Sequence, residues 1–427
     1  MEIRDVLIPI CVIALIAFMG VFAYEHWPQD VPEQQEQSYE IYQCIPLSNF
    51  GEDPQVSGAG EVVEIGGEPY VRMTSIGTLV ANDKAYTVGP ARLDLVVLSG
   101  QSNSVFYTSP SYYPGPSPVA PGTAFVLGNP DLASGTLAGL MTPETVDMCG
   151  LMDFVDDQGG VRVSQMYPAF LHAYVQETGH RVLVVNTGIG GQGIASWDRG
   201  EQCDLWMTQA LEKAKEIEED GTIELSPTVV LWAQGETDRF RTQEYYEEKL
   251  EDLIGRLTGD YYPYSFPQMT SVIPRFAGHG PDDMITSALA QIAVAETVPE
   301  FTVATVLPPR LPSDLYRDSV HWQQAPYGWF GEALGRQYAV DNGLGTVAET
   351  IVYCEDLGEV SELPYMLTAY GTSGEGYEIL VNWIETDEPG TYRANWLGNP
   401  IGCKLYEGLS CTATLVQEDE EDEEESE

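Results

Sequence analysis

Basic residues are scarce in this sequence of 427 residues: 19 Lys and Arg stand against 66 Asp and Glu, a formal net charge of −47. Binding to nucleic-acid phosphates depends on Lys and Arg, so this balance argues against a nucleic-acid partner. Nine of the acids lie in the last eleven residues, 417–427. We interpret this tail as a disordered, solvated segment rather than a specific metal- or partner-binding element.

Cysteine and histidine are also few, with seven and five residues. The sequence has no CxxC pair and no histidine at a zinc-ligand spacing, which argues against a metal site, and we expect no cofactor. Cys11 lies in an apolar run. The other six would allow up to three disulfides in an oxidising compartment, with Cys403 and Cys411 as the first candidate pair. These six are Cys44, Cys149, Cys203, Cys354, Cys403 and Cys411.

The one long apolar run covers residues 6–24. At a rise of 1.5 Å per residue it can just span a bilayer core of about 30 Å. Arg4 precedes the run and acids follow it, so the positive-inside rule places the rest of the chain outside the cell membrane. We favour a single-pass anchor at 1–26, followed by a polar linker at 27–60. Cleavage near Ala23 would instead release a secreted protein.

From residue 61 the chain shows short strands with turns at 66–67 and 82–83, and from about residue 95 strands and helices alternate. This alternation predicts an α/β domain at 61–340, with a parallel sheet between two helical layers. The Pro-, Gly- and Ser-rich stretch 107–160 does not fit the alternation. We interpret it as a loop excursion that either shapes a substrate site or is a surface insertion.

After residue 341 the helical pattern ends. Short β-type runs separated by turns predict a small all-β sandwich at 341–416. The runs Val381-x-Trp383 and Gly390-Thr391-Tyr392-x-Ala394 resemble a bacterial Ig-like domain of the kind appended to secreted carbohydrate enzymes. We expect this module to act as a spacer more than as a carbohydrate binder.

Three predicted strands end in glycine-rich segments, at 100–103, 188–197 and 234–238. Parallel strands bring such ends to one edge of a sheet, where ligands bind. Glycine there lets backbone N–H groups approach a ligand, as an oxyanion hole requires. The first segment presents Ser102 directly after an apolar strand, which makes it the candidate nucleophile.

A serine nucleophile needs a base and a carboxylate that orients the base. Of the five histidines, His321 is preferred because Asp318 precedes it by three residues, a spacing that lets the carboxylate reach the imidazole. The sequence therefore predicts a Ser102, His321 and Asp318 constellation.

These segments together resemble the SGNH hydrolase superfamily, in particular the carbohydrate O-acetylesterases that include sialate O-acetylesterases and some acetylxylan esterases. The resemblance covers about 90–340. It rests on four blocks in the family's order: Gly100-Gln101-Ser102-Asn103, Gly190-Gly191-x-x-Ile194-x-x-Trp197, Trp232-x-Gln234-Gly235-Glu236-x-Asp238, and Asp318-x-x-His321 with Gly328 after it.

The resemblance implies a flavodoxin-like sheet and a Ser-His-Asp mechanism, with an oxyanion hole formed by the N–H groups of Ser102 and Gly191, Gly190 being the alternative. The superfamily uses an asparagine of the third block as a further donor. This chain has none there. Thr237 occupies the nearest position and Gln234 has a suitable amide; we expect Gln234 to take the place of the asparagine, with Glu236 as a buttress. Trp197 is expected to pack rather than to stack on substrate.

The sequence thus predicts an exported carbohydrate O-acetylesterase acting on an acetylated glycan. Two alternatives stay open: a non-catalytic surface protein or adhesin on the same fold, and a lipase or thioesterase of the superfamily. A non-catalytic protein would lack one of the three residues, whereas all are present. A lipase would need an apolar acyl channel, which the polar stretch 107–160 does not suggest.

Overall fold

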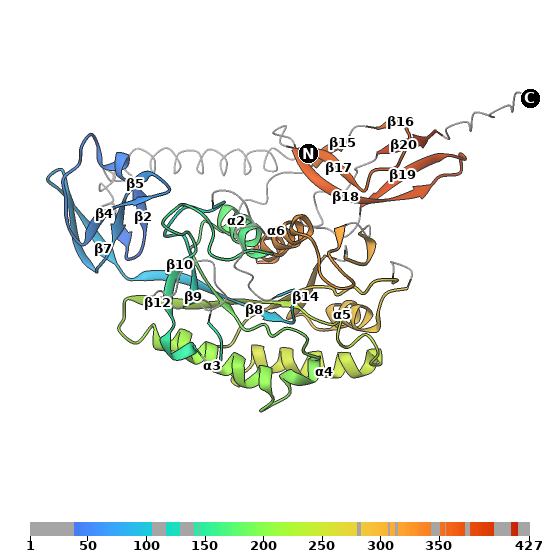
Figure 1. Ribbon diagram of the computed structural model, residues 1–427, viewed down its shortest axis with the longest axis horizontal. Coiled ribbons are helices and arrows are strands. Elements are labelled where there is room, and N and C mark those ends of the chain that lie inside the picture. The colour runs from blue at the N-terminus through green and yellow to red at the C-terminus, as the bar shows by residue number, and fades with distance from the viewer. Residues whose placement is uncertain are drawn as a thin grey trace, which may run out of the picture.

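The computed structural model describes residues 38–104, 117–128, 141–143, 145–279, 283–305, 308–311, 315–342, 351–354, 356–371, 376–396 and 411–416. A seven-stranded sheet forms its centre, with the strand order β10-β9-β11-β8-β12-β13-β14 (Figure 1). All neighbouring strands are parallel except β10, which is antiparallel to β9. The strands are β8 (Ala91–Gly100), β9 (Ala124–Gly128), β10 (Gly150–Asp153), β11 (Val182–Asn186), β12 (Ile223–Ala233), β13 (Met269–Val272) and β14 (Phe301–Thr305).

Helices cover both faces of this sheet, which confirms the predicted α/β class (Figure 1). Side chains of β8 alternate between the faces: Leu95 and Val97 pack toward α3 and α4, Val96 and Leu98 toward α2 and α6. The helices are α2 (Tyr167–Thr178), α3 (Gln202–Glu216), α4 (Gln243–Thr258), α5 (Thr286–Thr297) and α6 (Gln324–Asp341). Short 3-10 helices are η1 (Leu47–Phe50), η3 (Val146–Met148), η4 (Ile194–Trp197) and η5 (Pro308–Arg310).

Helix α6 was not expected from the sequence, because glycines interrupt its apolar pattern. Two of them have a packing reason: a Cβ at Gly331 would lie 2.1 Å from the Met166 carbonyl oxygen, and one at Gly335 2.8 Å from that of Phe170. Only glycine allows α6 to lie this close to α2. The helix begins at Gln324, three residues after His321.

The excursion predicted for 107–160 is only partly a loop. It contributes β9, whose five residues are all buried, and β10 at the edge of the sheet. The apolar run of β9 is short and enclosed by Pro- and Gly-rich sequence, which hides its strand character. Residues 105–116 and 129–140 lie outside the described residues.

The linker predicted at 27–60 is also shorter than expected, since residues 38–60 are already structured. They form β1 (Ser38–Glu40), β2 (Cys44–Pro46), η1 and β3 (Val56–Gly58). With β4 (Gly60–Ile65), β5 (Glu68–Met73), β6 (Gly77–Ala81) and β7 (Lys84–Gly89) they make the sheets β1-β7-β6-β3 and β2-β5-β4. Strands of three residues are too short to show an alternating pattern, which explains the error. The predicted turns at 66–67 and 82–83 are confirmed.

The described C-terminal residues form β-strands, as predicted for 341–416, and these make a six-stranded sheet in the order β15-β17-β18-β19-β20-β16. The first half of β18 pairs with β17 and the second half with β19. The strands are β15 (Ile351–Cys354), β16 (Gly358–Val360), β17 (Met366–Gly371), β18 (Gly376–Glu385), β19 (Thr391–Trp396) and β20 (Thr412–Leu415). The Ig-like assignment stays a prediction.

Cys44, Cys149 and Cys203 are buried free thiols, so the three disulfides that six cysteines would allow are not formed. Each side chain is enclosed by the core rather than placed opposite another cysteine. Cys403 lies outside the described residues, and its pairing with Cys411 stays a prediction. Across the described ranges no helix combines the length and apolarity needed to cross a membrane, and the anchor predicted at 6–24 falls outside them.

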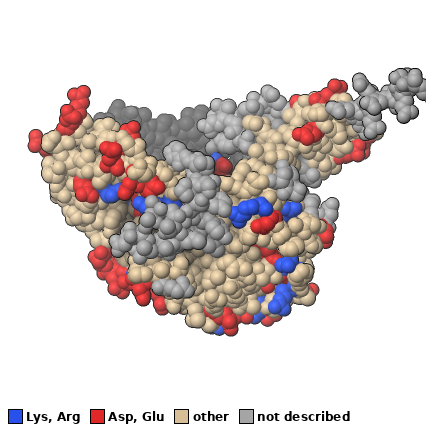
Figure 2. Space-filling view, viewed as in Figure 1, with Lys and Arg blue, Asp and Glu red and all other residues tan. Residues whose placement is uncertain are grey.

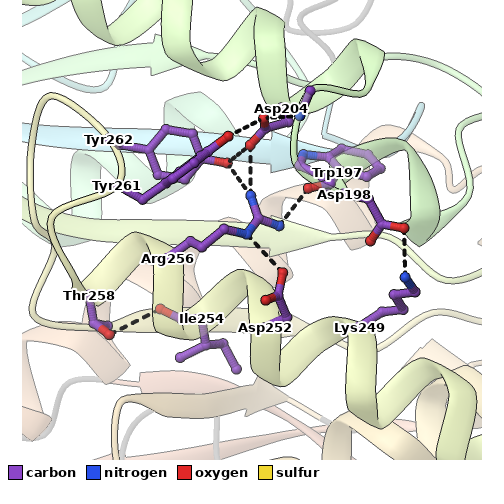
Figure 3. A network of polar contacts seen from close by, with 11 residues as sticks. Trp197, Asp198, Asp204, Lys249, Asp252, Ile254, Arg256, Thr258, Tyr261 and Tyr262 are labelled. Atoms are coloured by element: carbon purple, nitrogen blue, oxygen red, sulfur yellow. Dashed lines mark hydrogen bonds and ion pairs between the residues drawn. The ribbon is translucent and has the colours of Figure 1, made fainter.

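A buried ionic network joins α4 to η4 and to the first turn of α3 (Figure 3). The Arg256 guanidinium donates to Asp204 Oδ1 at 2.7 Å and to the Trp197 carbonyl oxygen at 2.5 Å. Tyr262 also donates to Asp204, and Tyr261 does so from the same segment. This network holds the end of the second glycine-rich segment, at Trp197, against α4.

We expect Asp204→Ala to lower the free energy of unfolding by about 3–5 kcal/mol, because it leaves the buried Arg256 charge without this partner. Asp252→Ala is the matched control. Asp252 bonds the same guanidinium at 2.8 Å, but its side chain is 51% exposed against 1% for Asp204, so its loss should cost less than about 1 kcal/mol. Urea denaturation of both variants measures the difference, and equal losses would contradict this account.

Candidate active site

Ser102, His321 and Asp318 lie in one hydrogen-bonded row, although 219 residues separate the serine from the histidine. His321 Nε2 is 2.7 Å from Ser102 Oγ, and His321 Nδ1 is 2.7 Å from Asp318 Oδ2. The imidazole is only 22% exposed. With Nδ1–H donating to the carboxylate, Nε2 is left to accept the serine proton, the geometry that a general base requires.

Asp318 is held as a carboxylate by its own loop. Partial burial opposes ionisation, but the N–H groups of Val320 and His321 donate to Oδ1 at 3.0 and 2.9 Å. Together with the imidazole they lower the pKa of Asp318 to about 2. Asp318 therefore stays ionised at neutral pH, which fixes the His321 tautomer.

The turn that carries Ser102 begins where β8 ends. Gly100 has φ 130°, and a Cβ there would lie 2.2 Å from the Ala233 carbonyl oxygen on the neighbouring strand β12. A side chain at this position would separate the two strand ends. The close approach turns the chain sharply out of the sheet and presents Ser102 at its carboxyl edge.

The second glycine-rich segment lies beside the nucleophile. A Cβ at Gly190 would be 3.9 Å from Ser102 Cβ, and Gly191 is exposed with φ 74°. Within the described part of the chain, neither the Ser102 N–H nor the Gly191 N–H donates a hydrogen bond. Two backbone donors are therefore available near the serine, as stabilisation of an oxyanion requires.

The prediction that Gln234 supplies a further oxyanion donor is wrong. Gln234 is fully buried, and its Nε2 already donates to Asp238 Oδ2 at 2.6 Å and to the Gln192 carbonyl oxygen at 3.0 Å. Its Oε1 accepts from Tyr246 at 2.6 Å. Gln234 instead holds Asp238, which accepts the Ile194 N–H at 2.7 Å and so joins the second and third segments.

Asn103, next to Ser102, bonds both the third glycine-rich segment and the histidine loop. The sequence analysis predicted no role for this residue. Its Nδ2 donates to Glu236 Oε1 at 2.6 Å and to the Val320 carbonyl oxygen at 3.1 Å, while its Oδ1 accepts from Tyr327 at 2.8 Å. Val320 precedes His321. The Asn103 side chain thus links the serine turn to the histidine loop.

Glu236 lies behind this amide as the expected buttress, with its side chain buried. Burial raises the pKa of the Glu236 carboxyl to about 7, although the hydrogen bond from Asn103 lowers it. Its second oxygen, Oε2, is buried and has no hydrogen-bond partner. Burial therefore favours the protonated, neutral form of this carboxyl near neutral pH.

Trp197 packs in the core, as expected: its ring is 1% exposed and lies 4.9 Å from that of Trp232. Asn103 and Asp238 belong to the sequence blocks, but their roles depend on contacts between distant segments. No local pattern reveals such contacts. Among the described residues, no three His, Cys, Asp or Glu side chains gather as a possible metal-binding group.

Residues 153–340 match the model of a protein family described as carbohydrate esterase, sialic acid-specific acetylesterase. The match includes Gly191, Asp318 and His321, whereas Ser102 lies before it. It confirms the resemblance to the carbohydrate acetylesterase branch that the four blocks predicted. No curated protein matches the chain.

Three solved structures are similar to the chain at low identity. A protein from Arabidopsis thaliana is 20% identical, with 58% of this chain and 98% of that chain covered and a TM-score of 0.39. A carbohydrate acetylesterase from Xanthomonas citri is 13% identical, with 86% and 94% covered and a TM-score of 0.41. NanS is 12% identical, with 60% and 99% covered and a TM-score of 0.39.

We expect Asn103→Ala to lower kcat by roughly 10- to 100-fold with a smaller change in KM, because the serine turn and the histidine loop lose their shared anchor. Steady-state kinetics with p-nitrophenyl acetate measures this. Tyr327→Phe, which removes a single hydrogen bond of the same side chain, should have a milder effect. An Asn103→Ala variant with wild-type kcat would contradict the proposed anchor.

The raised pKa of Glu236 predicts a pH dependence of stability. Because its folded-state pKa of about 7 exceeds the usual 4.5, the folded protein binds this proton more tightly than the unfolded chain. Ionisation therefore removes stability as pH rises from about 4.5 to 7, on the order of 3 kcal/mol in total. Glu236→Gln cannot ionise, so its free energy of unfolding relative to wild type should increase between pH 5 and pH 8. A pH-independent difference in urea denaturation would contradict this.

Proposed function

We propose that this chain, whose residues 153–340 match a carbohydrate acetylesterase family, removes acetyl groups from sugars with Ser102 as the nucleophile. One observation carries the proposal: Ser102 Oγ, His321 and Asp318 form a continuous hydrogen-bonded row. Such a row activates a serine hydroxyl, which is a weak nucleophile on its own. The family match supports the acetyl-sugar class of substrate.

In the acylation step, Ser102 Oγ attacks the acetyl carbonyl carbon while His321 Nε2 takes its proton. The negative charge that develops on the carbonyl oxygen is met by the N–H groups of Ser102 and Gly191. When the intermediate collapses, the bond between the acetyl carbon and the sugar oxygen breaks. His321 returns the proton to that oxygen, so that the free sugar hydroxyl leaves and an acetyl-Ser102 ester remains.

In the deacylation step, water takes the place of the sugar. His321 Nε2 accepts a proton from the water as its oxygen attacks the acetyl carbon, and the same two N–H groups stabilise the second intermediate. The bond to Ser102 Oγ then breaks, and His321 protonates the serine. Acetic acid leaves, ionises at neutral pH, and the enzyme returns to its starting state. The ionised Asp318 stabilises the imidazolium in both steps.

We also propose that the apolar run at 6–24 anchors the protein in the cell membrane with the catalytic domain outside, or is cleaved to release it. This proposal rests on the length of the run and on Arg4 before it. The acidic character of the chain is compatible with an exported protein that works at a charged surface.

We expect Ser102→Ala to lower acetate release from acetylated sugars and from p-nitrophenyl acetate by at least about 10³-fold, because no other group forms the acyl-enzyme. Ser226→Ala is the control. Ser226 lies near the amino end of β12, beside Asp94, whereas Ser102 follows the carboxyl end of β8, and the loss of Ser226 should leave activity intact. Full activity in Ser102→Ala would overturn the proposed mechanism, and a wild-type chain inactive on every acetyl ester would favour the non-catalytic alternative.

A further inference from the structure

A cavity of about 230 Å³ lies between the N-terminal strands and β10, the edge strand of the central sheet. We call it the edge cavity. The N-terminal strands lie at the end of the central sheet where β8 begins (Figure 1). Two aromatic rings, two guanidinium groups and two carboxyl groups line the edge cavity, together with aliphatic side chains. The aromatic and charged residues are Tyr42, Phe125, Arg72, Arg162, Asp153 and Asp157.

The edge cavity is remote from the candidate active site. Phe125 pairs with Leu183, which pairs with Leu95, and Leu95 lies five residues before β8 ends at Gly100. With a rise of about 3.3 Å per residue, this places Phe125 roughly 17 Å from the end of β8, measured along the strands. Ser102 lies beyond that end. A ligand in the edge cavity therefore does not contact the Ser102 row.

The aromatic wall of the edge cavity is fixed by the surrounding fold. The Phe125 ring centroid lies 5.3 Å from the Arg181 guanidinium carbon and 6.3 Å from the Tyr42 ring. Tyr42 has φ 69°, a left-handed conformation that is unfavourable for a tyrosine. Its N–H donates to the Met73 carbonyl oxygen at 2.9 Å, and a Cβ at Gly122 would lie 2.5 Å from its carbonyl oxygen. Strain of this kind persists where the surroundings impose it, and it concentrates at binding sites.

The charged groups of the edge cavity are also held in place. The Asp153 carboxylate accepts the N–H groups of Gly122 and Val155 at 2.7 and 3.0 Å. Arg162 Nε donates to the Asp153 carbonyl oxygen at 2.8 Å. Arg72 belongs to β5, the middle strand of the sheet β2-β5-β4. A carboxylate has acceptor sites for several hydrogen bonds and a guanidinium has several donors, so fixed donors and acceptors stand side by side here.

Charge balance selects the class of ligand. Burial raises the pKa of Asp153 to about 6, so the carboxylate form prevails at neutral pH. An anion in the edge cavity would meet Asp153 and Asp157, and a cation would meet Arg72 and Arg162. A hydroxyl group is neutral and both donates and accepts hydrogen bonds, so it suits either kind of partner. A zwitterion is also balanced, but the two aromatic rings favour a ligand with an apolar face.

The size of the edge cavity limits the ligand further. Its volume of about 230 Å³ is below the range of about 300–1,000 Å³ that is typical of sites for drug-sized ligands. The space therefore suits one ring rather than a chain of rings. A pyranose combines a ring of this size with several hydroxyl groups and an apolar C–H face.

We propose that the edge cavity binds one pyranose ring of a neutral sugar, at a second site separate from Ser102. The hydroxyl groups of the sugar bond the carboxylates and guanidinium groups, and its C–H face lies against Tyr42 and Phe125. Binding at this site requires no chemistry at Ser102, so the inference goes beyond the proposed function.

The test measures sugar binding to the full chain by saturation-transfer NMR. The probes are the methyl glycosides of glucose, galactose, mannose and N-acetylglucosamine, with glycine as the zwitterion and inorganic phosphate as the anion. We expect at least one glycoside to bind with a Kd in the millimolar range, as for a small ligand held by a few hydrogen bonds. Neither glycine nor phosphate should displace it.

Two substitutions locate the bound sugar. Arg72→Gln and Asp157→Asn should each raise the Kd of the glycoside roughly 10-fold, because each removes a charge-assisted hydrogen bond. Asp157 is exposed, so its substitution does not disturb the core. Arg92→Gln is the matched control, since it removes the same charge from the start of β8, outside the lining of the edge cavity, where the side chain is 75% exposed. It should keep the wild-type Kd.

Each other outcome counts against the proposal. Failure of every glycoside to bind overturns it, and so does binding of glycine or phosphate in their place. A Kd that neither Arg72→Gln nor Asp157→Asn changes places the sugar elsewhere, for example at Ser102. An equal loss in Arg92→Gln shows a long-range effect of charge rather than a contact. None of these results bears on acetate release from p-nitrophenyl acetate, so the proposed function is tested separately.

Discussion

The contact between Ser102 and His321 depends on the buried side chain of Asn103. A serine and a histidine 219 residues apart stay 2.7 Å from each other only if their backbones are fixed together. The Asn103 amide does this, because it bonds the segment before His321 on one side and Glu236 on the other. Buried polar groups are strongly disfavoured without partners, so this arrangement resists displacement. The proposed chemistry thus relies on a residue that does not itself react.

Local patterns predicted much of the fold and part of the site. The alternation of apolar strands with helices and the glycine-rich strand ends were predicted because each depends on residues close in sequence. Helix α6 and strand β9 were not predicted. Gly331 and Gly335 allow α6 to contact α2 closely, but they weaken the helical pattern of the sequence. Strand β9 is short. The Gln234 prediction failed for the same physical reason, since its donors are taken by Asp238 and Gln192 from elsewhere in the chain. Long-range contacts determine which hydrogen-bond donors of a side chain remain available to a substrate.

Acidic side chains are found in two settings in this molecule, on the surface and beside Ser102. Acidic side chains are spread over the N-terminal strands, the lower helical layer and the C-terminal sheet, and few basic ones appear among them (Figure 2). Near Ser102 the carboxyl groups are held by partners: Asp318 accepts hydrogen bonds from His321 and from two backbone N–H groups, and Glu236 is buried with a raised pKa.

The most direct test of the central claim is to locate the covalent intermediate. The full chain is incubated with a serine-reactive fluorophosphonate, digested, and its peptides are sequenced by mass spectrometry. The account predicts a single modified peptide with the label on Ser102, and loss of that label in His321→Ala, because the hydroxyl then lacks its base. A label on another serine, or none on Ser102 in a chain that still releases acetate, would contradict the account.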